Sequence, residues 1–426
     1  MTAAGHAADL AIQAAAAGAA AVPDWQGLRA DFPGLARRVH DKPLVYLDNA
    51  NTAQRPLPVL AAMDRYHRHY NANVARAVHT LGAEATQAYE SVRDVMARFL
   101  GAGSREEIVF TSGTTQAINL VAYSWGGANV GPGDVVLVTQ MEHHANIVPW
   151  QLLCQRTGAT LAVAPILASG ELDLAALPAL LDDRVKLFAF THVSNALGTI
   201  NPVAELCALA RARGIVTVVD GSQAAPHLPI DVQATGCDFY AVTGHKMFGP
   251  TGTGVLYGRA ERLAAMPPFL GGGEMIDEVS FDGTTFAAPP HRFEAGTPNI
   301  AGIIGLGAAA QYLLGIGLAA IAAREQALAA HALRTLRAVP GLRLIGEAAA
   351  RAPVFSFLLD GAQAQDVATL IDLDGIAVRS GHHCAHPLMR FYGVAATCRA
   401  SLAFYNAESE IDALAAALGR ARALLA

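Results

Sequence analysis

The 426-residue sequence has only five cysteines, an odd number scattered along the chain. Disulfide frameworks are typical of short, cysteine-dense secreted chains, so this pattern argues against one and favours a reducing cytoplasm. The alanine-rich stretch AIQAAAAGAAAV follows no basic segment and lacks a leucine-rich core, so we expect no secretory signal. No apolar run approaches the ~20 residues that span a bilayer, so we expect no membrane segment.

Positive charge is also scarce, with 30 Lys and Arg against 36 Asp and Glu and a formal net charge of -6. Since no basic stripe is present to neutralise a phosphate backbone, we expect no nucleic-acid binding. Hydrophobic residues make up 53% of the chain, which is enough to bury a large core. We see no internal repeat, and we expect one large domain and one smaller domain.

Short apolar runs alternate with longer helical patterns through the first two thirds of the chain. The runs are EEIVF, DVVLVT, TLAVAP, VKLFAFTHVS and GIVTVVD. Strands that are apolar throughout are typical of a parallel sheet covered by helices on both faces, so the sequence predicts an α/β fold. We predict an alanine-rich N-terminal extension over residues 1–22 and a large domain over 41–295. Residues 23–40 and 296–426, rich in Ala and Leu helices after Gly296, would form a smaller α+β domain.

Polar residues follow several of these runs, at the edge of the sheet where ligands usually bind. IVFTSGTTQAIN leads from a predicted strand into a helix that begins near Thr115. Backbone N–H groups at a helix start, beside the hydroxyls of Thr114 and Thr115, could bind a phosphate. Ser and Thr are also ordinary helix caps, so both interpretations stay open. The segment has no Gly-Lys pair of a Walker loop, and no GxGxxG fingerprint follows the first strands.

Two further segments place single ionisable residues after apolar runs. Asp220 ends GIVTVVD, and Gln223 follows it by three residues. Lys246 stands alone among apolar and glycine residues in VTGHKMFGPTGTG, after Thr243 and His245. Burial disfavours the charged form of an amine and lets it act as a base or a Schiff-base partner. Taken singly, Asp220 is equally a turn residue and Lys246 a solvated loop residue.

Together these features fit pyridoxal phosphate, which needs a lysine for its aldehyde, a carboxylate for its ring nitrogen and hydroxyls at a helix start for its phosphate. His143 follows another strand, and an imidazole is flat enough to lie against the pyridine ring. Zinc is the competing interpretation, because His143 and His144 could join His382, His383 and His386. Adjacent histidines in an extended chain point to opposite sides, so we expect no metal site.

The sequence also resembles a known family, the Suf-type cysteine desulfurases, which belong to class V of the fold-type I pyridoxal-phosphate enzymes. The resemblance runs from VYLDNANTAQRP to CRASLAFYN and on towards the C-terminus. It is carried by NANVARAVHTL, MEHHANIVPWQ, THVSNALGTINPV, CDFYAVTGHKMFGPTGTGVLYG, GGGEMI, RFEAGTPN and RSGHHCAHPLM. It implies a mostly parallel seven-stranded sheet between helices in the large domain.

The resemblance implies a role for individual residues. Lys246 would attach the cofactor, Asp220 would bind its ring nitrogen, and Gln223 would bind its phenolic oxygen. His143 would stack on the ring and shuttle protons. The residues implied at the phosphate are Thr114, Thr115, Thr243 and His245, with Thr297 reaching across from the second subunit of a homodimer. Those implied at the substrate are Asn195, which also touches the cofactor, Arg399, Arg379 and Arg76.

The resemblance also implies the use of Cys384, which would take sulfur from L-cysteine, keep it as a persulfide and release L-alanine. A small acceptor protein would then receive the sulfur for iron-sulfur cluster assembly. A selenocysteine lyase acting on L-selenocysteine is an alternative, as is a desulfurase carried in a protein shell through residues 1–22. Ala75, where the family commonly reads His, and Gln116, where Glu is usual, depart from the pattern. The residues expected to be buried and inert are Cys154, Cys207, Cys237 and Cys398.

Overall fold

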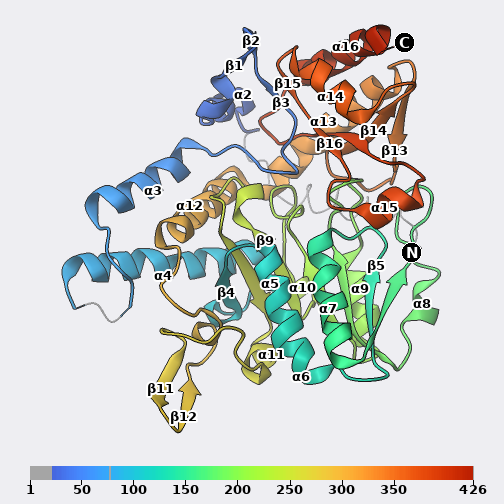
Figure 1. Ribbon diagram of the computed structural model, residues 1–426. Coiled ribbons are helices and arrows are strands. Elements are labelled where there is room, and N and C mark those ends of the chain that lie inside the picture. The colour runs from blue at the N-terminus through green and yellow to red at the C-terminus, as the bar shows by residue number, and fades with distance from the viewer. Residues whose placement is uncertain (1–21, 76–77, 426) are drawn as a thin grey trace.

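The computed structural model describes residues 22–75 and 78–425 of the chain (Figure 1). Arg76, expected near the substrate, lies outside the described residues, and so do residues 1–21 of the extension proposed to reach a shell. These two expectations therefore stay predictions.

A seven-stranded sheet forms the centre of the lower part of the molecule in Figure 1. Its strands are β4 (Ile108–Thr111), β5 (Val135–Thr139), β6 (Thr160–Ala164), β7 (Val185–Thr191), β8 (Val216–Asp220), β9 (Phe239–Thr243) and β10 (Gly254–Gly258). Their order across the sheet is β4-β10-β9-β8-β7-β5-β6. Strands β6, β5, β7, β8 and β9 run parallel, and β10 runs antiparallel to both β9 and β4. The predicted α/β fold with a mostly parallel sheet is confirmed.

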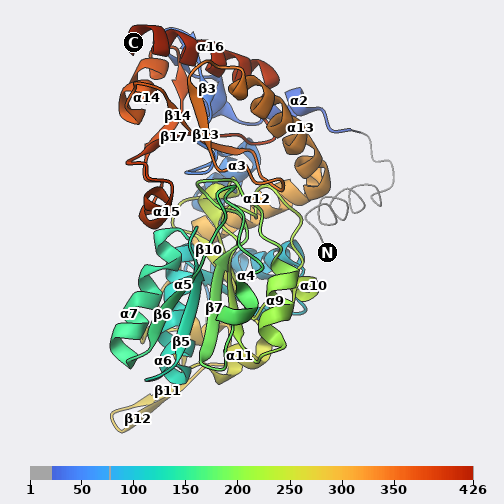
Figure 2. The same ribbon diagram turned by 90° about the vertical axis from the view of Figure 1, so that its right-hand side faces the viewer.

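Helices cover both faces of this sheet, as the turned view in Figure 2 shows. Helices α5 (Thr114–Val121) and α7 (Val148–Thr157) lie on one side, and α4 (Thr80–Leu100) and α9 (Val203–Arg211) on the other. Successive residues of a strand point to opposite faces. Val136 and Val138 of β5 therefore pack with Ile118 of α5, whereas Leu137 packs in the core that contains Leu206 of α9. Both faces of the strand are buried, which is why its sequence is continuously apolar.

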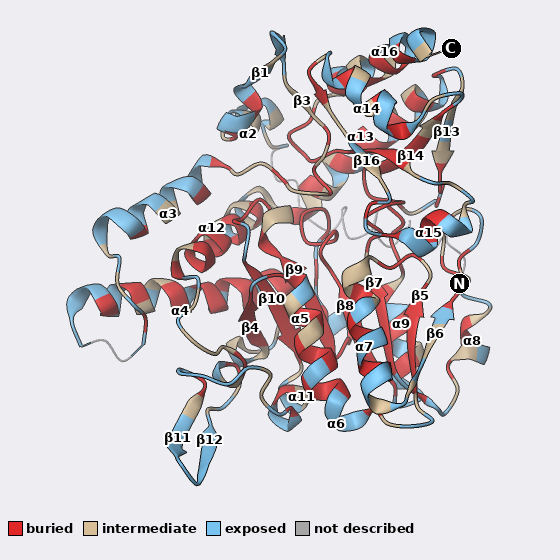
Figure 3. Ribbon diagram, in the orientation of Figure 1, coloured by how far each residue is buried: buried red, intermediate tan, exposed pale blue. Residues whose placement is uncertain are grey.

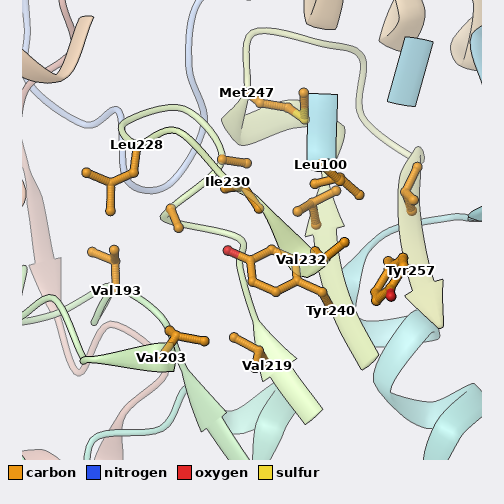
Figure 4. Close-up of a cluster of buried hydrophobic side chains, with 14 of the residues drawn as sticks. Leu100, Val193, Val203, Val219, Leu228, Ile230, Val232, Tyr240, Met247 and Tyr257 are labelled. Carbon is orange, nitrogen blue, oxygen red and sulfur yellow. The ribbon is translucent and has the colours of Figure 1, made fainter. Parts of the chain in front are cut away.

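One of these cores anchors the chain beside the predicted lysine. Figure 4 shows Tyr240 of β9 among buried apolar side chains that include Val219, Leu228 and Met247. Met247 is fully buried and directly follows Lys246 in the chain. Packing of Met247 therefore fixes the backbone from which the Lys246 side chain projects.

Helix α12 (Ile300–Ile316) packs against α3 (Leu57–His69) and α4. The approach to α4 is close, because a Cβ added at Gly307 would lie only 2.6 Å from Val92 Cγ2. Glycine at this position lets the two helices meet. The division into a large domain at 41–295 and a small domain at 23–40 and 296–426 stays a prediction.

A four-stranded antiparallel sheet lies in the upper part of Figure 1, with a hydrophobic core of its own. Its order is β13 (Leu342–Ile345), β14 (Val354–Leu359), β17 (Thr397–Ser401) and β16 (Arg379–Gly381). Helices α13 (Leu318–Arg337), α14 (Ala364–Asp372) and α16 (Glu408–Leu425) contribute to the same core. This sheet carries two predicted site residues, Arg379 on β16 and Arg399 on β17.

The remaining elements are short. They are α2 (Trp25–Ala30), α6 (Gly127–Asn129), α8 (Leu177–Leu180), α10 (Val232–Thr235), α11 (Ala260–Ala265), α15 (His386–Phe391), β1 (Arg38–Val39), β2 (Lys42–Pro43), β3 (Val45–Tyr46), β15 (Ile376–Ala377), β11 (Ile276–Ser280) and β12 (Gly283–Phe286). Strands β11 and β12 form a hairpin that projects from the molecule and is largely exposed (Figure 3). In residues 22–75 and 78–425, no single helix has the length and apolarity to cross a membrane, although α12 and α13, bent by 76°, pass that test together.

Arg93 of α4 is buried, and its contacts connect α4, β4 and the segment that contains Glu294. Its guanidinium pairs with Glu294 at 2.8 Å and with Glu90 at 2.9 Å, and Glu294 also accepts the N–H of Phe110. Removing one partner of a buried pair leaves the other charge without compensation.

We expect Arg93→Ala to lower the free energy of unfolding by about 3–5 kcal/mol, because it leaves Glu294 unpaired. Urea unfolding followed by circular dichroism measures the change. Arg68→Ala is the control, since Arg68 forms an exposed pair with Asp64 that contributes little. Equal, small effects of the two substitutions would contradict the assigned role of Arg93.

Candidate active site

A cavity of about 700 Å³ opens between the seven-stranded sheet and the segment that follows β16. Residues that follow the carboxyl ends of β5, β7, β8 and β9 line it, as is usual for open parallel sheets. The predicted residues in its lining are Thr114, Thr115, His143, Asn195, Asp220, Thr243, His245, Lys246, Arg379, Cys384 and Arg399. The structure thus brings together residues that are far apart in the sequence.

Two predicted residues of the described chain do not line this cavity. Gln223 is buried, its amide Nε2 donates to the carbonyl of Ala50 at 2.6 Å, and its Oε1 has no hydrogen-bond partner. Thr297 is exposed and lies between Gly296 and Pro298, which line a second cavity. The roles of Gln223 at the phenolic oxygen and of Thr297 across a dimer interface stay predictions.

Lys246 and Asp220 project from the ends of neighbouring strands. Asp220 is the last residue of β8, and Lys246 ends the 3₁₀ turn Gly244–Lys246 that follows β9. Burial lowers the pKa of Lys246 to about 8, and Asp220 opposes this shift. The described residues contain no ion pair between Lys246 and Asp220, so both groups remain available to a ligand that fills the cavity.

The residues predicted to bind a phosphate lie at and near the start of α5. Gly113 precedes this helix with φ of 145°, and a Cβ added there would lie 3.3 Å from Thr243 Oγ1. The missing side chain therefore leaves space between the helix start and the Thr243 hydroxyl. Ser222, which the sequence analysis missed, donates from its hydroxyl to Thr114 Oγ1 at 2.7 Å. Gln116, one of the two departures, accepts the N–H of Ser112 and so closes the same loop.

Arg399 is buried and held in place from two sides. Its Nη1 donates to the carbonyl of Asn195 at 2.9 Å, and its Nη2 donates to Asp48 Oδ1 at 3.2 Å. The other Asp48 oxygen pairs with Arg379 at 3.5 Å. Asp48 therefore offsets part of the positive charge of two arginines, a role that sequence reasoning did not find. The Nε of Arg399 is buried and has no hydrogen-bond partner among the described residues.

Cys384 is exposed in the turn between β16 and α15. Both His383 and Cys384 have positive φ, 52° and 55°, which residues other than glycine rarely adopt. Two hydrogen bonds from the large-sheet side support this backbone. Asn195 Nδ2 donates to the carbonyl of His383 at 2.7 Å, and the N–H of His144 donates to the carbonyl of Cys384 at 2.8 Å.

The other four cysteines are buried, as expected, and all five are free thiols. Burial raises the pKa of Cys207 and of Cys398 to about 12, and it also raises the pKa of Cys154 and Cys237. Each of these thiols is therefore protonated and unreactive near neutral pH. Cys384 is the exposed member of the set and the one that lines the cavity.

His143 is held in one orientation in the cavity. Its Nδ1 accepts the N–H of Ala145 at 3.0 Å, so in the neutral ring the proton lies on Nε2. Burial lowers the pKa of His143 to about 4, with a further contribution from Lys246. The imidazole is therefore neutral at physiological pH.

Three other histidines meet near Cys384, but their rings stack. His144 and His386 have nearly parallel planes, 9° apart, and His382 stacks on His386 with ring centroids 3.9 Å apart. Stacked rings do not direct their lone pairs to one point. The described part of the chain holds no group of three His, Cys, Asp or Glu side chains arranged for a metal ion.

These residues fit the expected cofactor, pyridoxal phosphate. The cavity volume lies in the range typical of cofactor sites. Gly113 leaves room for a phosphate at the start of α5, and Lys246 supplies an amine with a depressed pKa. Thr114, Thr115, Thr243 and His245 would hold the phosphate, Asp220 the ring nitrogen, and Lys246 the aldehyde.

The chain is similar to known proteins over most of its length. The model of the family "Aminotransferase class-V" matches residues 45–414. A relative from Xylella fastidiosa (strain 9a5c), named "Probable cysteine desulfurase", is 61% identical over 403 residues, which cover 95% of this chain and 97% of the relative.

Solved structures resemble this one closely. The crystal structure of the cysteine desulfurase CsdA from Escherichia coli has a TM-score of 0.89 and 40% identity, covering 95% of this chain and 100% of that chain. A mutant of C-DES with glycine covalently linked to the PLP cofactor has a TM-score of 0.79 and 26% identity, covering 93% of this chain and 99% of that chain.

The low pKa of Lys246 can be measured directly. In the cofactor-free protein, we expect acetylation of Lys246, followed by mass spectrometry across pH, to reach half its maximum at about 8. Asp220→Asn removes a carboxylate that stabilises the ammonium, so the midpoint should move lower still. A midpoint near 10.5, the ordinary value, or an upward shift in the variant would contradict the assigned electrostatics.

Proposed function

The chain belongs to the class-V aminotransferase family, and we propose that Cys384 is the thiol that receives the sulfur of its substrate. The protein is a pyridoxal-phosphate-dependent cysteine desulfurase, which converts L-cysteine to L-alanine. The observation that supports the role of Cys384 is that its exposed thiol and the amine of Lys246 line the same cavity.

Arg399 would bind the substrate carboxylate. Its guanidinium is oriented by Asp48 and by the Asn195 carbonyl, and its unpartnered Nε faces no competing protein acceptor. Charge-assisted hydrogen bonds from guanidinium to carboxylate are among the strongest in proteins. Arg379 would add a second positive charge from the Cys384 side, and Asp48 would keep the two arginines from repelling each other.

When bound, pyridoxal phosphate supplies an electron sink for the α-carbon of the substrate. Lys246 would carry protons at this carbon, because an amine with a pKa of about 8 exists in both forms near neutral pH. His143, neutral and fixed through Nδ1, would present a flat face and an Nε2–H in the cavity. Its predicted part as a proton carrier would run through Nε2.

Sulfur transfer then requires the Cys384 thiolate. It would attack the substrate sulfur, so that an S–S bond forms as the C–S bond breaks. The electron pair of the C–S bond stays with carbon and is protonated to give alanine, while Cys384 keeps the sulfur as a persulfide. No external oxidant or reductant is needed, since one thiol and cysteine become one persulfide and alanine.

We further propose a desulfurase type, partners and a cellular location for this protein. The motif RSGHHCAHPLM around Cys384 supports the Suf type, and the exposure of Cys384 supports delivery of its sulfur to a small acceptor protein for iron-sulfur clusters. A homodimer follows from the family resemblance, in which the exposed Thr297 would reach the site of the partner subunit. The five free thiols support a reducing, cytoplasmic location.

Replacing Cys384 tests the proposed function. We expect Cys384→Ala to lower the rates of sulfide and alanine production from cysteine by at least about a hundredfold, because the nucleophile is gone. An assay of both products measures this, with the visible absorbance of the cofactor unchanged. Cys154→Ala, at a buried cysteine, should keep full activity.

The same variant separates the two candidate substrates. Selenide is a better leaving group than sulfide, so turnover of selenocysteine should largely survive in Cys384→Ala. Unchanged cysteine turnover in that variant would overturn the role of Cys384. A wild-type protein that acts on selenocysteine alone would favour the selenocysteine lyase.

Arg399→Lys tests substrate binding. Lysine keeps the charge but loses the two-pronged contact, so we expect KM for cysteine to rise about ten- to a hundredfold, as for the loss of a charged hydrogen bond. kcat should change much less, since the contact is made before and during reaction. Steady-state kinetics measure both values. A fall in kcat at constant KM would contradict a carboxylate-binding role.

A further inference from the structure

We propose that His144 and His386 form a clamp that positions the Cys384 backbone at the cavity, and that sulfur capture depends on this clamp. The proposal rests on the proposed role of Cys384. His144 directly follows His143 at the end of β5, and His386 is the first residue of α15, two residues after Cys384. Neither residue has a part in the reaction described above.

The contact between the two residues is specific. His144 Nε2 accepts the backbone N–H of His386 at 3.1 Å and lies 3.0 Å from His386 Nδ1. An Nε2 that accepts these donors carries no proton, so His144 is neutral with its proton on Nδ1. Burial and the neighbouring His386 and His382 lower the pKa of His144, which favours this neutral form. His382 stacks on His386 and extends the contact.

The clamp spans the turn that contains the thiol. The N–H of His144 donates to the carbonyl of Cys384, while the side chain of the same residue binds His386. One residue of the large-sheet side therefore holds the turn both at Cys384 and two residues beyond it. Positive φ at His383 and Cys384 is an unfavourable conformation that surrounding contacts must maintain.

The His144 half of the clamp is rigid. The buried carboxyl group of Glu142 accepts hydrogen bonds from the N–H of Thr191 at 3.0 Å, from Asn146 Nδ2 at 2.6 Å and from the hydroxyl of Thr139. Trp150 Nε1 donates in turn to Asn146 Oδ1 at 2.9 Å. These bonds fix the turn His144–Asn146 to the ends of β5 and β7.

The other half of the clamp is exposed. His382, Cys384 and His386 are all exposed, and a Cβ added at Gly381 would meet no atom within 4 Å. Between these residues, His383 and Ala385 are buried, and His383 Nε2 lies 2.8 Å from Thr397 Oγ1. The turn is therefore anchored at His383 as well as by its contacts with His144 and Asn195. Without the His386 side chain, which supplies the Nδ1 contact and the ring stacking, we expect the thiol to sample positions from which it cannot reach the substrate sulfur.

His386→Ala tests the clamp, since an exposed residue can be replaced without loss of the fold. We expect kcat for cysteine to fall about tenfold, because a misplaced nucleophile loses orientation. KM should stay within about twofold, since substrate binding uses other residues. Selenocysteine turnover and the cofactor absorbance should not change. The rate at which iodoacetamide alkylates Cys384 should rise as the turn becomes freer.

Two matched variants complete the experiment. His386→Asn retains a side-chain N–H near the position of Nδ1 and should restore most of the lost kcat. His331→Ala removes another histidine, one that pairs with Asp412 far from the site, and should behave as wild type. Unchanged cysteine turnover in His386→Ala, or an equal loss with selenocysteine, would overturn the clamp.

Cys384→Ala, assayed beside these variants, separates the two proposals. If Cys384→Ala is inactive with cysteine but His386→Ala is fully active, only the clamp fails. If Cys384→Ala keeps its activity, the proposed function fails, and the clamp fails with it.

Discussion

The site depends on a constraint of the parallel sheet, which delivers the ends of adjacent strands to the same edge. Asp220 at the end of β8 and Lys246 just after β9 therefore enter one cavity from neighbouring positions. Burial there depresses the pKa of the amine, while the carboxylate keeps it from falling further. An amine of lowered pKa and a buried carboxylate, unpaired with each other, are what a cofactor with an aldehyde and a ring nitrogen requires.

The seven-stranded sheet alone does not complete the site. The four-stranded sheet brings Arg399 on β17 and the Cys384 turn after β16 to the open side of the cavity. Two hydrogen bonds at Asn195 join these parts, one to the Cys384 turn and one from Arg399. The group proposed to bind the substrate and the group proposed to receive its sulfur are thus held by one residue of the large-sheet side.

Much of this arrangement could be predicted from the sequence. Continuous apolar runs identified the buried strands, and the polar residues after them pointed to Thr114, Asp220 and Lys246 of the lining. The places of Asn195, Arg379 and Arg399 came from the family resemblance. The sequence did not reveal Asp48, because it is 351 residues from Arg399 along the chain and follows an unremarkable short strand. The contact between His144 and His386, 242 residues apart, was missed for the same reason. Such pairs depend on how the two sheets meet, which local patterns do not encode. The positions of Gln223 and Thr297 outside the cavity depend on tertiary structure in the same way.

The most direct test of the account is the mass of the Cys384 peptide after the protein, with its cofactor, turns over a limited amount of cysteine without reductant. The account predicts that this peptide gains the mass of one sulfur atom and that an equal amount of alanine appears. Alanine formed while the added sulfur is found on Cys154, Cys207, Cys237 or Cys398, or on no cysteine, would contradict it.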